Sequence, residues 1–383
     1  MAGNKTYNSE KSDLISVTTD YSIPTGFTLS GVKADSYKLS WKKISEAQSY
    51  NVYIKSGDDF VKKANVTTNS YSPTKLTAGK VDTYKVSAVY KIDGKTVESE
   101  LSDETKGATT PSKVKNLTAT PYTKSVKLTW SKVTGATHYD VYILNDGEYV
   151  LKSTVSNTNC KLTGLSEGAT YRFAVRAKIK LSSGTAYGSK VSVGKTLKPA
   201  KVTKIIVSSV TTTQHKVSWS AAKGANYYYV YRYSSSKGKY VKVASTASKS
   251  YTFKGLSAGK TYNYIVYSAV VKDGKELSRG DKSVTYKFST LPSKVSGLKS
   301  TSVASSKVSL SWSKVSASTS YQVYYYSKAL GKYVLAGTTD KNTYTVKGLS
   351  SKTNYSFKVR AVRTVSGTNY YGSYSSVLSL KTK

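Results

Sequence analysis

The sequence is poor in the residues that build reactive or cross-linked sites. Its single cysteine, Cys160, excludes an internal disulfide framework. Its two histidines, His138 and His215, lie far apart, and there is neither a cysteine cluster nor a histidine pair at the spacing of metal ligands. The glycines occur singly, so a phosphate-cradling loop is absent. We therefore expect no catalytic, cofactor-binding or metal-binding residues, and a protein that is not an enzyme.

Arginine and acidic residues are also scarce. The formal net charge is +38, from 59 Lys and Arg against 21 Asp and Glu, and only six of the basic residues are arginines. Lysine keeps β-rich surfaces soluble, whereas forked recognition of phosphate or guanine uses arginine. The composition therefore predicts solubility with unspecific attraction to polyanions such as cell-wall polymers or glycosaminoglycans, and no specific nucleic-acid partner.

Long apolar runs are absent too. No stretch has the apolar length of a membrane span, so this segment is expected not to insert into a membrane. The N-terminal residues MAGNKTYNSEKSD lack the apolar core of a signal peptide. Two interpretations are open: a cytosolic protein, or a piece of a larger secreted chain that begins at an added methionine.

What the sequence does contain is an internal repeat. Tryptophan recurs at intervals of about 90 residues, and tyrosines follow it nine and twelve residues later. The four sets are Trp41, Tyr50 and Tyr53; Trp130, Tyr139 and Tyr142; Trp219, Tyr228 and Tyr231; and Trp312, Tyr321 and Tyr324. Such self-similarity indicates one folding unit copied four times. A feature of all four copies is then expected to be scaffold, and a feature of one copy to be drift or function.

The segments around these aromatic residues alternate between apolar and polar side chains, as half-buried strands do. In YKLSW, Tyr37, Leu39 and Trp41 share the face that is predicted to point inward. In YNVYIK, Tyr50, Val52 and Ile54 face inward and Tyr53 faces outward. No segment shows a helical period, so the chain is predicted to be all-β.

Two rare residues occupy inward positions of this pattern. Cys160 is predicted to be a buried structural thiol, and His215 a buried histidine at the end of a core. At the Cys160 position the other copies hold Tyr71, Tyr251 and Tyr344. At the His215 position they hold Tyr37, Val126 and Val308.

A leucine followed by a tyrosine completes the pattern. The pairs are Leu76 and Tyr84, Leu165 and Tyr171, Leu256 and Tyr262, and Leu349 and Tyr355. The tyrosine comes six residues after the leucine in the last three copies and eight residues after it in the first. Seven short strands with one tryptophan on the second and this pair ahead of the sixth resemble the fibronectin type III domain. The resemblance implies tandem immunoglobulin-like β-sandwiches in which the tyrosine hydroxyl bonds back to the chain near the leucine.

The resemblance covers about residues 22–383. It implies repeats over 22–110, 111–198, 199–291 and 292–383, with a proline at the start of each of the last three. Residues 1–21 hold few apolar positions before Ile23 and are expected to be a flexible lead-in. Because proline fixes φ and linkers are nearly absent, we expect the four sandwiches to form an elongated, semi-rigid rod.

The Lys-, Ser- and Tyr-rich composition is similar to type III modules of Gram-positive bacterial surface and secreted proteins. This likeness favours the second interpretation of the N-terminus, an extracellular or cell-surface fragment of a larger secreted chain. It implies a non-catalytic spacer, adhesion or protein-interaction module whose partner is a protein or glycan at a cell surface or in a host matrix.

A stripe of outward tyrosines is the first candidate interaction face. It consists of Tyr227, Tyr229, Tyr231 and Tyr233 in the third copy, Tyr267 on the neighbouring strand, and Tyr324 and Tyr326 in the fourth copy. The neighbouring strand presents Arg176 in the second copy and Arg360 in the fourth. Flat exposed rings can stack on sugars or hold a protein partner. Alternatively, exposed tyrosine simply favours strand formation and packs against lysine stems.

The tripeptide Arg279-Gly280-Asp281 occurs in the third copy alone. Vertebrate type III domains present this tripeptide to integrins from the loop between the last two strands. Here the hairpin turn falls at residues 272–275, so the tripeptide is expected a few residues into the last strand. We favour a chance match, although a bulge that exposed Gly280 would favour receptor binding.

Three functional hypotheses follow. The first is the extracellular spacer and interaction module. The second is a carbohydrate-binding accessory region of a polysaccharide-degrading enzyme, acting through the tyrosines, and the third is a ligand for an integrin-like host receptor. Unspecific polyanion binding competes with all three and predicts affinity that collapses as salt rises.

Overall fold

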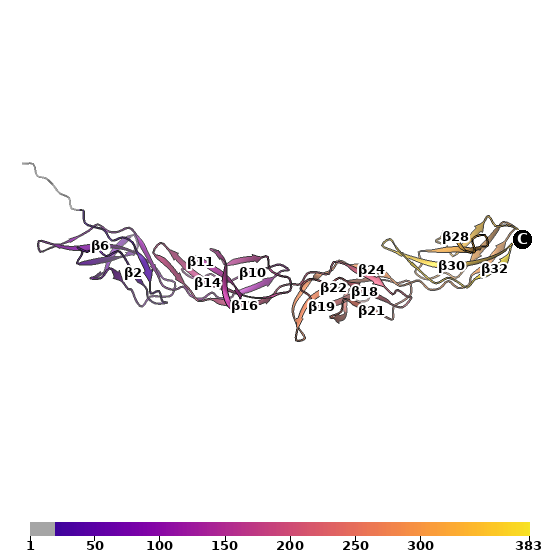
Figure 1. The fold of residues 1–383 in the computed structure, drawn as a ribbon, viewed down its shortest axis with the longest axis horizontal. Coiled ribbons are helices and arrows are strands. Elements are labelled where there is room, and N and C mark those ends of the chain that lie inside the picture. The colour runs from indigo at the N-terminus through magenta and orange to yellow at the C-terminus, as the bar shows by residue number, and fades with distance from the viewer. Residues whose placement is uncertain (1–19) are drawn as a thin grey trace, which may run out of the picture. The chain divides into compact units, whose positions relative to one another are not determined.

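The computed structural model describes residues 20–383, and every regular element within them is a β-strand (Figure 1). The first copy contains β1 (Thr28–Ser30), β2 (Lys38–Ser40), β3 (Ser49–Ser56), β4 (Asp59–Val66), β5 (Ser70–Tyr71), β6 (Val81–Ile92), β7 (Lys95–Glu98) and β8 (Thr105–Ala108). The second contains β9 (Thr118–Pro121), β10 (Ser125–Thr129), β11 (His138–Asn145), β12 (Glu148–Val155), β13 (Asn159–Thr163), β14 (Thr170–Leu181), β15 (Gly184–Tyr187) and β16 (Val191–Thr196). The third contains β17 (Ile205–Ser208), β18 (His215–Trp219), β19 (Tyr227–Ser234), β20 (Lys239–Thr246), β21 (Ser250–Phe253), β22 (Thr261–Lys272), β23 (Lys275–Lys282) and β24 (Tyr286–Ser289). The fourth contains β25 (Lys299–Val303), β26 (Lys307–Ser311), β27 (Ser320–Ser327), β28 (Lys332–Thr339), β29 (Thr343–Lys347), β30 (Asn354–Val365), β31 (Thr368–Tyr371) and β32 (Leu378–Lys381).

Each copy forms one three-stranded and one five-stranded sheet. In the first copy the orders are β1-β2-β5 and β4-β3-β6-β7, with β8 also pairing with β6. The other three copies repeat both orders strand for strand. The prediction of an all-β chain built from repeated sandwich sheets is confirmed.

The recurrent tryptophan and inner tyrosine form the centre of each core. The ring centroids are 5.4 Å apart for Trp41–Tyr50, 5.3 Å for Trp130–Tyr139, 5.5 Å for Trp219–Tyr228 and 5.3 Å for Trp312–Tyr321. The tyrosine hydroxyls accept hydrogen bonds from the backbone N–H groups of Ile44, Val133, Ala222 and Val315 at 2.9, 2.9, 3.1 and 2.8 Å. All four indoles are at most 5% exposed, which confirms that these aromatic residues are core scaffold and not a cleft.

The last strand of each copy is broken into two segments, whereas the sequence predicted one continuous strand. In the first copy β7 and β8 both pair with β6. Between them the hydroxyls of Ser99 and Ser102 accept hydrogen bonds from the backbone N–H groups of Ala88 at 2.9 Å and Val86 at 3.0 Å. Because serine side chains take the place of backbone carbonyls there, the strand can kink without leaving buried donors unpaired.

The predicted corner tyrosine is confirmed in the third and fourth copies. The hydroxyls of Tyr262 and Tyr355 accept hydrogen bonds from the backbone N–H groups of Ser257 and Ser350, each at 2.9 Å. These bonds tie the start of β22 and β30 to the loops that follow Leu256 and Leu349.

In the first copy the corner prediction was wrong. Tyr84 pairs with Thr105 just as Tyr264 pairs with Tyr286, so Tyr84 belongs to the core and is 1% exposed. Asp82 takes the corner position, six residues after its leucine as in the other copies, and its carboxylate accepts from Tyr84 at 3.4 Å. The loop after the leucine is therefore as long in the first copy as in the others, and the Asp82 carboxylate replaces the corner tyrosine.

Both rare inward residues are buried as predicted. Cys160 is 7% exposed, and burial raises the pKa of its thiol. His215 is 0% exposed, and its Nε2 lies 2.9 Å from the Tyr264 hydroxyl. At the positions of His215 and Tyr264 the first copy holds Tyr37 and Tyr84, whose hydroxyls are 2.8 Å apart.

The predicted lead-in, residues 1–21, lies outside the described residues except at its end. There Tyr21 packs on Tyr90 with ring centroids 5.0 Å apart, and the Tyr90 hydroxyl donates to the Ser22 carbonyl at 2.9 Å. The lead-in prediction was wrong for Tyr21, because apolar contact with Tyr90 makes it part of the first sandwich.

Candidate functional site

The outer face of the third copy's five-stranded sheet holds the predicted tyrosine stripe. Its strands place Tyr229 opposite Tyr267, and the alternation of β19 puts Tyr227, Tyr231 and Tyr233 on the same face. The rings contact one another edge to face, with centroids 5.8 Å apart for Tyr227–Tyr229 and 5.2 Å for Tyr231–Tyr267. The structure therefore brings the five predicted residues together.

Tyr229 is not an exposed ring, however. It is only 9% exposed, because the Arg279 guanidinium lies 4.7 Å and the Lys242 ammonium 5.1 Å from its ring centroid. Arg279 is held in place by Glu276, with its Nη2 2.7 Å from the carboxylate. Burial and a hydrogen bond to Glu276 raise the pKa of Tyr229. Of the two interpretations of the stripe, the structure favours for Tyr229 the one in which the ring packs against cationic side chains, here Lys242 and Arg279 from other strands.

The Arg279-Gly280-Asp281 tripeptide lies within β23, after a hairpin turn at residues 273 and 274 that falls inside the predicted range 272–275. A bulge is present there, between the pairs Tyr267–Lys282 and Ala269–Arg279, but it buries Gly280 and does not expose it. A Cβ atom at Gly280 would collide with the Ser268 hydroxyl and lie 2.8 Å from the carbonyl oxygen of Pro199, the first residue of the third copy.

This glycine has counterparts with the same constraint. Cβ atoms at Gly188 and Gly372 would lie 2.8 Å from the carbonyl oxygens of Pro111 and Pro292. Gly280 is therefore scaffold, and Asp281 binds Lys198 at 2.8 Å. The geometry favours the chance match over a receptor-binding loop.

The same outer face is internally paired in the second and fourth copies. The guanidinium of Arg176 lies 3.9 Å from the Tyr187 ring centroid, and that of Arg360 lies 4.0 Å from the Tyr371 ring centroid. In the third copy the two residue types are exchanged: Tyr267 stands at the arginine position and Arg279 at the tyrosine position. In these three copies an arginine thus packs on a tyrosine at the centre of the face.

Two predicted tyrosines remain accessible at the strand ends. Tyr233 is 40% exposed and Tyr326 is 38% exposed, each edge to face with a tyrosine of the adjacent strand at 5.4 Å. Tyr324, by contrast, is half-buried and accepts a hydrogen bond from Arg360 at 3.1 Å.

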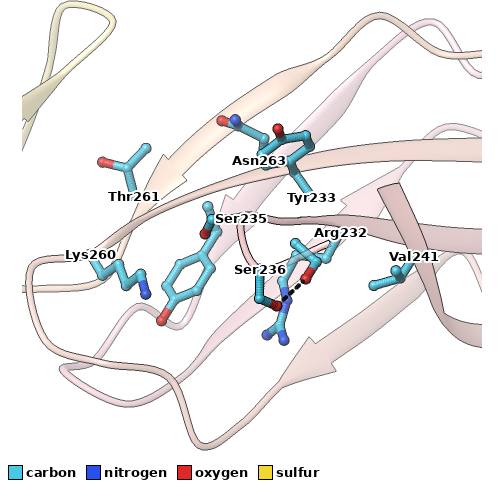
Figure 2. A pocket seen from close by; sticks show the side chains of 10 residues that line it. Arg232, Tyr233, Ser235, Ser236, Val241, Lys260, Thr261 and Asn263 are labelled. Atoms are coloured by element: carbon cyan, nitrogen blue, oxygen red, sulfur yellow. Dashed lines mark hydrogen bonds between the residues drawn. The ribbon is translucent and has the colours of Figure 1, made fainter. Parts of the chain in front are cut away.

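Tyr233 borders a basic pocket that the sequence pattern did not reveal (Figure 2). The pocket has a volume of about 350 Å³ and lies between the end of β19, the following turn and the start of β22. Its lining comprises Arg232, Tyr233, Ser234, Ser235, Ser236, Val241, Lys260, Thr261, Tyr262 and Asn263. It contains two cations, two phenol rings and several hydroxyls, but no carboxylate.

A signal for this pocket was present in the sequence. Arg232 pairs with Tyr264 in the register at which Ile54, Ile143 and Tyr325 pair with their own partners. A single arginine at a position that is otherwise apolar or aromatic marks the third copy, yet only comparison of the repeats strand by strand makes it visible.

The part of the chain that the structure describes contains neither a cluster of metal ligands nor a membrane-spanning helix. Within residues 20–383, no group of three or more His, Cys, Asp or Glu side chains could hold a metal ion. The described residues also include no helix long and apolar enough to cross a membrane. What these residues can do chemically is bind: the pocket offers cations to an anion, phenol rings to an apolar ring face and hydroxyls to a polar rim.

Comparison with known proteins gives three relatives of interest. Receptor-type tyrosine-protein phosphatase eta of Gallus gallus is 26% identical over 239 residues, which is 62% of this chain and 17% of the relative. Exoglucanase B of Cellulomonas fimi is 28% identical over 275 residues, 65% of this chain and 24% of the relative. Chitinase A1 of Niallia circulans is 29% identical over 191 residues, 46% of this chain and 26% of the relative. The chain thus spans about a quarter or less of the length of these relatives.

The family assignment comes from a second comparison. The fibronectin type III domain model matches residues 111–193, 200–285 and 293–376, more than half of the chain. The first copy lies outside these matches but has the same sheet orders. The chain therefore belongs to the fibronectin type III family, and three tandem domains of that type follow one another in it.

Proposed function

We propose that this chain is a non-catalytic spacer and interaction segment of a larger extracellular protein, of the kind found at Gram-positive bacterial surfaces. The short, proline-marked junctions predicted from the sequence support the spacer role. Two of the relatives, from Cellulomonas fimi and Niallia circulans, support the bacterial setting.

One observation carries the interaction role. All four copies have the same buried Trp–Tyr core, whereas exposed tyrosines beside basic pockets are seen at the strand ends of the third and fourth copies. Because the core positions are fully used for packing, recognition is left to these surface features. We therefore place the partner-binding region on the third and fourth copies, at Tyr233 and Tyr326.

The experiment measures binding of the labelled full chain to cellulose, chitin, bacterial cell walls and coated matrix proteins, at low and moderate salt. We expect binding to at least one of them at moderate salt, and about a tenfold loss in the Tyr233→Ala/Tyr326→Ala double variant. Leu144→Ala is the matched control, since Leu144 holds the Tyr233 position in the second copy. Binding that reaches every polyanion and vanishes at moderate salt would leave only unspecific charge, and hydrolysis of any polymer would refute the non-catalytic role.

A carbohydrate-binding accessory role beside a polysaccharide-degrading enzyme is the second candidate. Two observations favour it: an exoglucanase and a chitinase are among the relatives, and Tyr233 and Tyr262 border the same pocket. Selective binding to a polysaccharide in the experiment above, without binding to matrix proteins, would favour this candidate over a protein-interaction role.

A further inference from the structure

We infer that the pocket of the third copy binds one acidic sugar residue of a polysaccharide, with Arg232 and Lys260 holding its anionic group. This inference rests on the carbohydrate-binding candidate and adds the class of sugar and the residues. Figure 2 shows Arg232, Lys260 and Ser236 around the pocket, which lies beside the exposed Tyr233 ring.

The charge of the pocket is the first step. Arg232 is half-buried at a position where the first two copies have Ile54 and Ile143. Among the described residues its guanidinium has no hydrogen-bond or ion-pair partner, and it lies 5.6 Å from the centroid of the Tyr262 ring. Lys260 also lines the pocket and likewise has no ion-pair partner among residues 20–383. Two unpaired cations facing one cavity without a carboxylate favour an anion there.

The shape and the remaining lining indicate that the anion belongs to a sugar. A volume of about 350 Å³ is at the lower end for small-molecule sites, which suits one sugar ring better than an extended peptide. Tyr233 and Tyr262 supply phenol rings against which the apolar face of a pyranose can pack. Ser235 and Ser236 supply hydroxyls for a polar rim, and the buried Asn263 Oδ1 has no hydrogen-bond partner. Cations, rings and hydroxyls together match a pyranose that carries a carboxylate.

The fourth copy supports the inference independently. It has a pocket at the same register, with a volume of about 430 Å³, lined in part by Tyr326, Lys328, Tyr355 and Lys381 and by no carboxylate. In the first copy the residue at the Tyr233 position is Lys55, which forms an ion pair with Glu104 at 3.7 Å. Unpaired basic charge beside tyrosine thus occurs in the third and fourth copies, whereas the basic residue of the first copy has an acidic partner.

The test is titration calorimetry of the full chain with digalacturonate, its uncharged methyl ester and inorganic sulfate. We expect digalacturonate to bind, the ester to bind at least tenfold more weakly, and sulfate alone to bind weakly. Arg232→Ile, which installs the residue of the first two copies, should lower digalacturonate affinity about tenfold or more. The control is Lys216→Ile, an exposed cation on the other sheet, which changes the net charge equally and should leave affinity unchanged.

Several results would overturn the inference. They are absence of digalacturonate binding, equal binding of acid and ester, equal losses in both variants, or sulfate binding as tightly as the sugar. If Arg232→Ile does not fold, Arg232→Lys decides, since it keeps the charge but loses the forked geometry; affinity equal to the parent would count against the assigned role. If digalacturonate does not bind but a polysaccharide still binds through Tyr233, the acidic-sugar inference is refuted and the carbohydrate-binding candidate is retained.

Discussion

Acid should weaken the third copy through His215. Its side chain is fully buried, and burial lowers its pKa from 6.5 to about 4. The unfolded chain therefore binds a proton at His215 before the folded chain does as the pH falls. The contribution of neutral His215 to the free energy of unfolding is fully present above about pH 6.5 and is lost progressively down to about pH 4. The difference between the two pKa values corresponds to a loss of about 3 kcal/mol in the free energy of unfolding.

The repeats provide the matched control for this prediction. The second and fourth copies hold Val126 with Phe173 and Val308 with Phe357 at the positions of His215 and Tyr264. The double variant His215→Val/Tyr264→Phe reproduces that apolar pair and should remove this part of the pH dependence.

The assay is hydrogen exchange of the β18 and β22 amides in increasing denaturant, at pH 7 and near pH 4, because a chain of several domains does not unfold in two states. The parent should lose about 3 kcal/mol more than the double variant between the two pH values. Equal losses in both proteins would refute the reasoning, since acidic groups elsewhere in the copy would then account for the effect.

The remaining predictions concern the scaffold. Tyr228→Phe removes the acceptor of the buried Ala222 N–H and should cost about 1–3 kcal/mol in the free energy of unfolding of the third copy, whereas no loss would mean that water reaches this amide. Gly280→Ala should destabilise that copy by about 1–3 kcal/mol, measured by the same exchange assay, and a neutral result would contradict the close carbonyl contact. In a double-mutant cycle, Arg360→Tyr and Tyr371→Arg together should cost about 0.5–1 kcal/mol less than the sum of the single changes, because the exchange restores the ring–cation pair; strict additivity would refute the pairing.

The sequence predicted the inner face well because burial follows from a local pattern. A period of two places Trp41 and Tyr50 inward wherever the strand pairs, and identical spacing in four copies leaves no other register. The outer face is different. Whether Tyr229 is exposed depends on Arg279, fifty residues later, and on the pairing of three strands that brings them together.

At one place residue type alone predicted the wrong role. In the first copy the pattern predicts Tyr84 as the corner, but the strand register gives that position to Asp82. At Gly280 the favoured prediction of a chance match agrees with the geometry, because the nearby Pro199 carbonyl oxygen leaves no room for a Cβ atom. In both cases contacts across strands, and not residue type alone, decide the role of the residue.

Some residues that differ between copies are matched by a second change at a contacting position, and others are not. Unmatched changes indicate where a ligand is expected. Two of the differences are compensated: where His215 replaces the valine of the second and fourth copies, Tyr264 replaces their phenylalanine, and where Arg279 replaces tyrosine, Tyr267 replaces arginine. Compensated exchanges keep buried groups satisfied, so selection for stability alone explains them. Arg232 is not compensated, since among the described residues no acid or acceptor came with it to pair the guanidinium. An unpaired charge in a half-buried position lowers stability unless something outside the chain pairs with it, and this makes the Arg232 pocket the place where a ligand is to be sought.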